Sequence, residues 1–220
     1  MMKGRSAVIF DMDGVIFDSE KAVIDCWKAI APQYGITDIE THCIAATGLN
    51  EEATRRIFKE QYGDELPYDE MRAKRKALFV ERFDKGLVPV KDGARELLSY
   101  LKENGYKTAL ASSTSEGTVR RELDKAGLLV FFDFIIGGNN VTHSKPDPEI
   151  FNKAMNGLGV KAEESIIIED SYNGIRAASA SGAYTVMVPD LLPPNDEMRH
   201  KADLIVSSLS DVKDLLNDGY

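Results

Sequence analysis

The apolar residues of the chain follow two different periodicities, and the change between them divides the sequence. An apolar run, Val8-Ile9-Phe10, ends at a polar Asp-Met-Asp-Gly stretch, and a short bounded run of this kind is typical of a buried strand. From Ser19 to Phe83 the apolar residues recur at helical spacing instead, with turn residues between the segments. We therefore expect a strand at 6–11, followed by helices at 19–34, 39–46, 51–62 and 68–83.

After Pro89 the pattern becomes an alternation of short apolar runs and amphipathic segments. Such alternation predicts βαβ units and a parallel sheet. The expected strands are 107–111, 131–136, 165–168, 184–188 and 204–206, and the expected helices are 92–105, 116–127, 148–158, 173–182 and one from 210 onwards. The predicted fold is α/β: a doubly wound, Rossmann-like parallel sheet core over 1–17 and 87–220, with an α-helical bundle cap domain, 18–86, inserted after the first strand.

The composition is that of a folded, acidic protein. The 220 residues include 43% hydrophobic and 29% charged residues, which is typical of globular rather than disordered chains. The formal net charge of -9 argues against non-specific binding to nucleic acid or anionic membrane, because both require a basic surface. Cys26 and Cys43 have no metal-ligand spacing, no apolar run could cross a bilayer, and the early first strand leaves no room for a signal peptide. We expect a cytoplasmic monomer.

Polar side chains follow four of the predicted strands or lie in the next loop. They are Asp11 and Asp13 after the first strand, Ser112 and Ser113 after the second, Lys145 in the loop after the third, and Glu169 and Asp170 after the fourth. Because the carboxyl ends of parallel strands share one edge of a sheet, these residues should gather there. Each has an ordinary alternative as a helix cap, turn residue or solvated lysine. Four complementary groups at one edge nevertheless indicate a site.

This combination of side chains suits phosphoryl transfer. One carboxylate can attack phosphorus and form an aspartyl-phosphate, and a second can protonate the leaving oxygen and later deprotonate a water. Further carboxylates can hold Mg²⁺, a hard cation that prefers oxygen ligands. A lysine and hydroxyl groups can neutralise the phosphoryl oxygens. The residues therefore predict a metal-assisted phosphoryl-transfer site.

The order of these segments resembles the haloacid dehalogenase superfamily of phosphotransferases. Four stretches carry the resemblance: Asp11-Met12-Asp13-Gly14-Val15, Ala111-Ser112-Ser113, Ser144-Lys145-Pro146-Asp147-Pro148 and Ile168-Glu169-Asp170-Ser171. The helical block is similar to the cap of the branch that includes β-phosphoglucomutase and small sugar-phosphate phosphatases. The likeness extends over the whole chain and is much more specific to the superfamily than to any one substrate.

The resemblance implies a role for each matching residue. Asp11 would be the nucleophile and Asp13 the general acid/base. The Asp11 side chain, the main-chain carbonyl of Asp13, and Asp170 would hold Mg²⁺, with Glu169 beside the ion. Ser112, with its neighbour Ser113, and Lys145 would bind the phosphoryl group. An aspartate at position 13 favours phosphoryl transfer over dehalogenation, because a leaving alcohol needs a proton.

The resemblance also bears on whether water or a sugar hydroxyl receives the phosphoryl group. In β-phosphoglucomutase a histidine on the first cap helix gates the acid/base, and the same distance from Asp13 leads here to Val23. In the place of an arginine that holds the second phosphate of the sugar, the stretch 48–52 has acidic residues, Glu51 and Glu52. A glutamate facing a second phosphate would be repulsive unless it is paired. Both departures favour a phosphatase over a mutase.

The last predicted cap helix carries a basic patch formed by Arg72, Lys74, Arg75 and Lys76. Most of these side chains are expected to form a solvated helix face. We expect one of them to meet the substrate, with Lys76 as the first choice. Trp27 is expected to belong to the core of the cap rather than to form a platform for a sugar.

The leading hypothesis is a Mg²⁺-dependent phosphatase acting on a small phosphorylated metabolite, with a sugar phosphate as the first choice. The alternative within the same class is β-phosphoglucomutase. Two non-enzymatic hypotheses are a receiver-like phospho-acceptor and a pseudoenzyme kept for binding. The long helical insertion and Asp13 argue against the receiver, and the presence of every motif residue argues against the pseudoenzyme.

Overall fold

The computed structural model describes residues 4–47, 51–83 and 88–218. The chain divides into two compact units. The core unit comprises Met1–Asp18 and Val90–Tyr220, and the helical unit comprises Ser19–Pro89. The predicted division placed the first boundary after residue 17, and its second boundary, between 86 and 87, lies outside the described residues. Within the described parts of the chain, no helix is long and apolar enough to cross a membrane.

The core unit is built on a six-stranded sheet with the order β3-β2-β1-β4-β5-β6. The strands are β1 (Ala7–Phe10), β2 (Lys107–Ser112), β3 (Phe134–Gly137), β4 (Ser165–Glu169), β5 (Tyr184–Met187) and β6 (Leu204–Ile205). Every neighbouring pair runs parallel. The strand order reverses beside β1, so the loops after β1, β2 and β4 open at a topological switch point.

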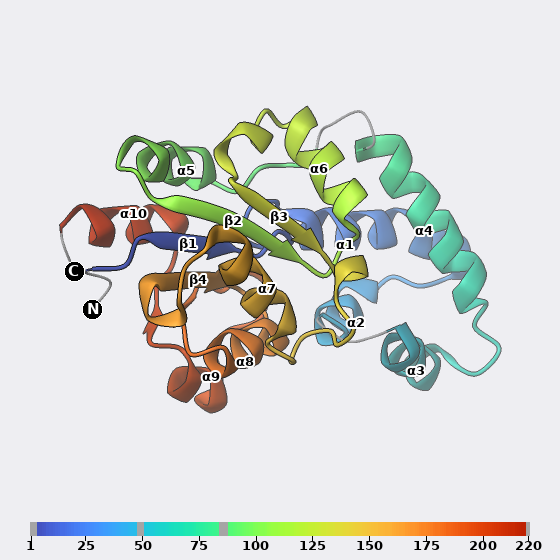
Figure 1. The fold of residues 1–220 in the computed structure, drawn as a ribbon. Coiled ribbons are helices and arrows are strands. Elements are labelled where there is room, and N and C mark those ends of the chain that lie inside the picture. The colour runs from blue at the N-terminus through green and yellow to red at the C-terminus, as the bar shows by residue number, and fades with distance from the viewer. Residues whose placement is uncertain (1–3, 48–50, 84–87, 219–220) are drawn as a thin grey trace. The chain divides into compact units, whose positions relative to one another are not determined.

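Helices cover both faces of this sheet (Figure 1). Figure 1 shows α5 (Ala94–Glu103) and α10 (Leu209–Asn217) on one side, with α7 (Glu149–Leu158) and α8 (Tyr172–Ala180) on the other. Further helices of this unit are α6 (Glu116–Lys125) and α9 (Asp196–Lys201), and 3₁₀ turns lie at Leu129–Phe131, Gly138–Asn140 and Ala162–Glu164. The predicted α/β fold with a doubly wound sheet is confirmed.

Alternation along the strands explains the double covering. Ile9, Ala109 and Ile167 belong to one buried apolar cluster that includes Phe151 and Met155 of α7. Residues next to them in sequence point to the opposite face, because successive strand side chains alternate. All four residues of β1 and all five of β4 are buried. Both strands are therefore central in the sheet, and the loop after each one begins between two neighbouring strands.

Two differences from the sequence expectations lie at the approach to β3 and at α9. The strand predicted at 131–136 begins only at Phe134, because Leu129–Phe131 forms a 3₁₀ turn. The Thr108 hydroxyl donates to the Phe131 carbonyl oxygen, and the Asp133 carboxylate accepts the Thr108 N–H at 2.8 Å. These side-chain bonds act together with the Asp133 N–H, which donates to the Thr108 carbonyl oxygen at 2.9 Å. Helix α9 was not predicted, since five of its six residues are polar and the single apolar residue, Met198, forms no stripe.

The helical unit contains α1 (Ser19–Ile30), α2 (Ile39–Ala45), α3 (Glu51–Tyr62) and α4 (Tyr68–Phe83). The predicted first helix, 19–34, divides at Ile30, where the 3₁₀ turn Ala31–Tyr34 begins with Pro32 in its first positions. Proline lacks the N–H that an α-helix would need there. Trp27 is buried, in agreement with its expected place in the core of this unit, and it packs against Phe58 with ring centroids 5.0 Å apart.

Candidate active site

The register of the sheet brings the ends of β1, β2 and β4 together. Phe10, the last residue of β1, is paired with Leu110 on one side and Ile168 on the other. The N–H of Asp11 donates to the carbonyl oxygen of Ile168 at 3.0 Å, which extends the strand by one residue. Asp11 therefore lies at the carboxyl end of β1, between the loops that follow β2 and β4.

Lys145 reaches this edge from the loop between β3 and α7. Its Nζ donates to Asp11 Oδ1 at 2.5 Å, to Glu169 Oε1 at 2.7 Å and to the Ala111 carbonyl oxygen at 3.3 Å. The side chain is only 7% exposed, and Nζ lies 4.7 Å from the centroid of the Phe151 ring. An ammonium has three donors, and here oxygens at the ends of three strands accept from them. Lys145 thus joins β1, β2 and β4 at one point.

Glu169 is held by hydrogen bonds on both carboxylate oxygens. Its Oε1 accepts from Lys145, and its Oε2 accepts from the N–H groups of Asp170 and Ser171, both at 2.8 Å, and from the Ser171 hydroxyl at 3.0 Å. A Cβ added to Gly174 of α8 would lie 1.7 Å from Oε1, so only glycine fits beside this carboxylate. These contacts favour Glu169 as a positioning residue that fixes Lys145 and the start of α8.

Asp170 packs against the turn that follows β1. A Cβ added to Gly14 would lie 2.3 Å from Asp170 Oδ2, and Gly14 has a φ of +81°, in the left-handed region that favours glycine. The turn is closed by the Gly14 N–H, which donates to the Phe17 carbonyl oxygen at 2.9 Å. This close approach brings the buried Asp170 carboxyl next to the main chain that also carries Asp13.

Asp13 and the serines after β2 lie at the same edge. Asp13 is half-buried, and its Oδ2 accepts a hydrogen bond from the Thr114 hydroxyl at 3.2 Å. Ser112 is fully buried, and its Oγ accepts from the Thr114 N–H at 3.0 Å, whereas Ser113 is exposed. Thr114 was not among the residues predicted for the site. Only the close approach of the two loops reveals that contact.

The electrostatics of the site are set by burial and by crowded carboxylates. Burial raises the pKa of Asp11 to about 7, and although the charge of Lys145 opposes the shift, Glu169 and Asp13 add to it. Burial alone would lower the pKa of Lys145, but the charges of Asp11 and Glu169 outweigh burial and raise it. Lys145 is therefore charged at neutral pH, and Asp11 is poised between its two forms until further positive charge is supplied.

The donor set at this edge fits a hard divalent cation. Asp11, Asp13, Glu169 and Asp170 bring four carboxylates to a site where Lys145 is the buried cation. After burial itself, the charges of Glu169 and Asp13 raise the pKa of Asp11. All the available ligand atoms are oxygens, which Mg²⁺ prefers. Because both oxygens of Glu169 already accept from protein donors, Asp11, Asp170 and the Asp13 carbonyl are the better ligands.

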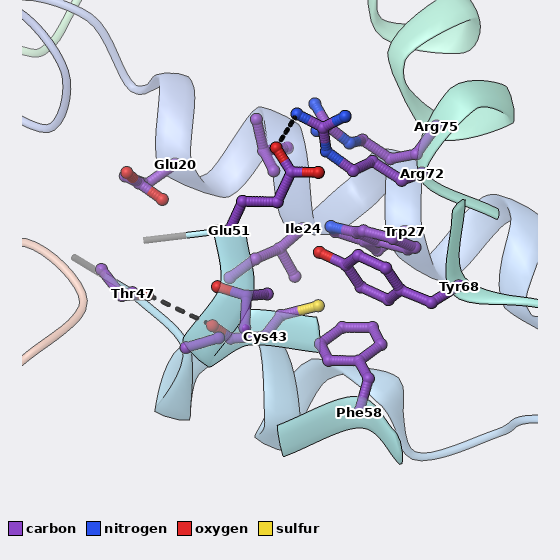
Figure 2. Close-up of a pocket in the computed structure, with 13 residues that line it drawn as sticks. Glu20, Ile24, Trp27, Cys43, Thr47, Glu51, Phe58, Tyr68, Arg72 and Arg75 are labelled. Carbon is purple, nitrogen blue, oxygen red and sulfur yellow. Dashed lines mark hydrogen bonds and ion pairs between the residues drawn. The ribbon is translucent and has the colours of Figure 1, made fainter. Parts of the chain in front are cut away.

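Lys76, the remaining predicted site residue, is an exposed residue of α4 in the helical unit. Two other members of the predicted basic patch, Arg72 and Arg75, line a cavity inside that unit (Figure 2). Arg72 forms an ion pair with Glu51 at 2.7 Å, and Arg55 lies 3.5 Å from the same carboxylate. The Glu51 carboxylate is thus paired, which removes the charge repulsion that had argued against a second phosphate.

The whole-chain pattern matches one family model. The model described as haloacid dehalogenase-like hydrolase matches residues 8–188. This chain belongs to that family. The matched span begins in β1 and ends just after β5, so it includes every loop of the carboxylate site and the whole helical unit. The predicted family is confirmed.

Individual relatives support the same placement. The chain is 32% identical over 180 residues to the phosphorylated carbohydrates phosphatase of Thermotoga maritima, covering 80% of this chain and 81% of that protein. A solved family hydrolase from Deinococcus radiodurans, with bound phosphate and sodium, is similar with a TM-score of 0.84 and 25% identity, covering 99% and 97% of the two chains. The β-phosphoglucomutase of Clostridium difficile is similar with a TM-score of 0.73 and 28% identity, over 98% and 97%. The predicted enzyme class, phosphatase, is the class named for the first relative.

Replacing Gly14 with alanine tests the packing of Asp170. The new Cβ would displace the Asp170 carboxylate, so we expect Mg²⁺-dependent activity to fall at least tenfold, roughly the loss of 1.4 kcal/mol or more of transition-state stabilisation. Gly105→Ala is the matched control, because Gly105 has a φ of +73° but nothing within 4 Å of an added Cβ. Both variants should lose about 1 kcal/mol of stability, and equal activities in the two would contradict the account.

The ionisation of Asp11 predicts a pH dependence of stability in the absence of divalent cations. The unfolded chain releases this proton near the ordinary value of 3.8, and the folded chain retains it up to about 7. The folded state binds more protons over this interval, so this contribution to stability is present below it and is lost as the pH rises through it. Asp11→Asn cannot ionise and should gain stability relative to the wild type as the pH rises from about 4 to about 7. Urea unfolding in a chelator measures the difference, and a constant difference would contradict the shift.

Proposed function

We propose that this protein is a Mg²⁺-dependent phosphatase that hydrolyses a small phosphorylated metabolite, with a sugar phosphate as the first candidate. The observation that carries the proposal is the three-way contact of Lys145 with Asp11, Glu169 and the end of β2, with Asp13 beside it. One sheet edge thereby brings together the three groups that the reaction needs. Asp11 supplies a nucleophilic carboxylate, Asp13 a carboxyl for proton transfer, and Lys145 a buried cation for the phosphoryl oxygens.

The proposed reaction has two steps. An oxygen of the Asp11 carboxylate attacks phosphorus, an aspartyl-phosphate forms, and the bond between phosphorus and the leaving oxygen breaks. Asp13 donates its proton to that oxygen, so the product leaves as an alcohol. A water then attacks the phosphoryl group, Asp13 takes its proton, and the bond to Asp11 breaks to release inorganic phosphate.

Neighbouring groups prepare both carboxyls for these roles. The Thr114 hydroxyl holds Asp13 at 3.2 Å and limits its rotation. Lys145 holds Asp11 and would attract the phosphoryl oxygens, and the buried Ser112 hydroxyl retains a proton to donate. Mg²⁺ bound to Asp11, Asp170 and the Asp13 carbonyl would supply positive charge that favours the ionised, nucleophilic form of Asp11.

A mutase remains the second candidate, and a specific contact favours it. Glu51 stands where the resembling mutase has an arginine, but Arg72 pairs with it at 2.7 Å and provides a guanidinium at that carboxylate. Val23 still stands where a gating histidine would be expected. Hydrolysis is the better supported outcome, because valine cannot transfer a proton as that histidine could and a relative at 32% identity is named as a phosphatase.

Phosphate release from a panel of sugar phosphates with Mg²⁺ tests the proposal. Asp11→Asn should lower release by at least about a thousandfold, because removal of a nucleophile eliminates the covalent route. Asp64→Asn, which changes an exposed carboxylate of the helical unit in the same way, should leave the rate unchanged. The well with β-glucose 1-phosphate should also be assayed for glucose 6-phosphate.

The two candidates give different products. Inorganic phosphate that depends on Asp11 supports the phosphatase and identifies its substrate class. Glucose 6-phosphate without free phosphate would replace the phosphatase with the mutase. Phosphate release that is equal in wild type and Asp11→Asn would reject the assignment of the nucleophile.

A further inference from the structure

The loop that carries Lys145 is closed on itself by the side chain of Glu149, the first residue of α7. The Thr142 N–H donates to both carboxylate oxygens of Glu149, at 3.0 and 3.1 Å, and the His143 N–H donates to Oε2 at 2.8 Å. The His143 ring also approaches Oε2, with Nδ1 3.1 Å away. Because Lys145 lies between these donors and their acceptor in the sequence, the bonds fix the backbone on both sides of it.

Local bonds tighten the same segment, 142–149. The Asp147 N–H donates to the Ser144 carbonyl oxygen at 3.0 Å, and Asp147 Oδ1 accepts from the Glu149 N–H at 2.9 Å. An aspartate that accepts from an N–H two residues further on stabilises a turn of the backbone. The segment is therefore a closed turn, and Lys145 lies in its middle.

Lys153 of α7 extends this arrangement beyond the turn. Its Nζ lies 2.6 Å from Glu149 Oε1 and donates to the Asn140 carbonyl oxygen at 2.7 Å. The Asn140 side chain in turn donates from Nδ2 to Glu116 Oε2 at 3.1 Å. Glu116 is the first residue of α6, the helix that follows the loop after β2. A chain of polar contacts thus runs from the turn at 142–149 to the start of α6.

The loop after β2 is held by the same stretch of chain. Asn139 Oδ1 accepts from the Glu116 N–H at 2.8 Å, and the Gly138 N–H donates to the Thr114 carbonyl oxygen at 2.9 Å. Thr114 is the residue whose hydroxyl contacts Asp13. The segment between β3 and α7 therefore supports Lys145 at one end and the partner of Asp13 at the other.

We propose that Glu149 is a positioning residue for the phosphoryl-transfer site, which holds Lys145 against Asp11 and, through Lys153, keeps the Lys145 loop in place relative to the loop that carries Thr114. Among the described residues, the hydrogen bonds of Glu149 go to loop N–H groups, to His143 and to Lys153, so it acts through Lys145. The predicted effect on the reaction rate rests on the proposed function, whereas the predicted effect on Lys145 itself does not.

A flexible cation needs such support. The lysine ammonium is carried by a four-carbon stem, and catalytic groups must be held within about 0.5 Å of their productive places. Lys153, and after it the N–H groups of Thr142 and His143, lower the pKa of Glu149 to about 2. The carboxylate is therefore ionised at neutral pH and only accepts hydrogen bonds. Glutamine in its place would turn an amide NH₂ toward N–H donors and disrupt the turn without changing its size.

Activity measurements test the effect on the reaction. Glu149→Gln should lower kcat for phosphate release at least about tenfold, because a displaced cation stabilises the transition state less well. Glu149→Asp keeps the charge on a shorter side chain and should restore part of kcat. Glu70→Gln is the matched control, since it removes an exposed ion pair of the same spacing, Glu70 with Lys74 at 2.9 Å, and should leave kcat unchanged.

The ammonium group of Lys145 provides a readout that needs no turnover. In protein with ¹⁵N-labelled lysine, burial and acceptors from the ends of three strands should slow the exchange of its protons with water and give a distinct NMR signal. Lys145→Arg, which lacks this signal, assigns it. We expect the signal to be lost in Glu149→Gln, weakened in Glu149→Asp and unchanged in Glu70→Gln.

The two measurements separate this inference from the proposed function. A wild type that releases no phosphate, with an ammonium signal that is still lost in Glu149→Gln, would reject the phosphatase and support the positioning of Lys145. A wild type without the signal, or an unchanged signal or kcat in Glu149→Gln, would overturn the inference. If Glu149→Gln does not fold, Glu149→Asp replaces it, and a wild-type kcat and signal in that variant would overturn the inference.

Discussion

The constraint on which the core unit depends is the compensation of buried negative charge at the carboxyl end of its sheet. Asp11 and Glu169 are almost completely removed from solvent, and a buried carboxylate is stable only when it is paired and hydrogen-bonded. Lys145 supplies one positive charge to both, from a side chain that is itself only 7% exposed. Loss of either partner from such a cluster would leave an uncompensated charge, which is far more costly than loss of a surface ion pair. Burial, with the charges of Glu169 and Asp13 adding to it, raises the pKa of Asp11 against the opposing charge of Lys145, and a divalent ion would supply further positive charge.

The surrounding chain is shaped by this cluster. Gly14 and Gly174 occur where a side chain would collide with Asp170 and Glu169, so the turn after β1 and helix α8 can lie closer to these carboxylates than any other residue would allow. The parallel register of β1 with β2 and β4 places the acidic loops side by side. The apolar side chains that cover the sheet keep water away from the strand ends where these loops begin. The fold and the chemistry therefore share one cause, because the same buried strands that stabilise the sheet also desolvate the groups at its edge.

The sequence predicted the parts of this structure that depend on local pattern. Strands such as Ser165–Glu169 and helices such as Glu51–Tyr62 follow from apolar periodicity and turn residues, and the α/β class follows from their alternation. It did not predict the 3₁₀ turn before Phe134 or the polar helix α9, since side-chain bonds and capping decide both. The site residues could be predicted from the sequence because the carboxyl ends of parallel strands lie at one edge of a sheet. Sequence spacing does not give the distances between residues that are far apart along the chain. It could not predict the contact of Thr114 with Asp13 or the ion pair of Glu51 with Arg72. Nor could it predict that both carboxylate oxygens of Glu169 accept hydrogen bonds.

The central claim is that Asp11 accepts a phosphoryl group, and intact-mass spectrometry with peptide mapping tests it most directly. The protein would be incubated with Mg²⁺ and acetyl phosphate, and Asp13→Asn would be compared with the wild type, because loss of the group that deprotonates water should slow hydrolysis of the intermediate. We expect a single phosphoryl group on Asp11, at higher occupancy in Asp13→Asn and absent in Asp11→Asn. A phosphoryl group on Ser112 or His143, or phosphate release with Asp11→Asn as active as the wild type, would contradict it.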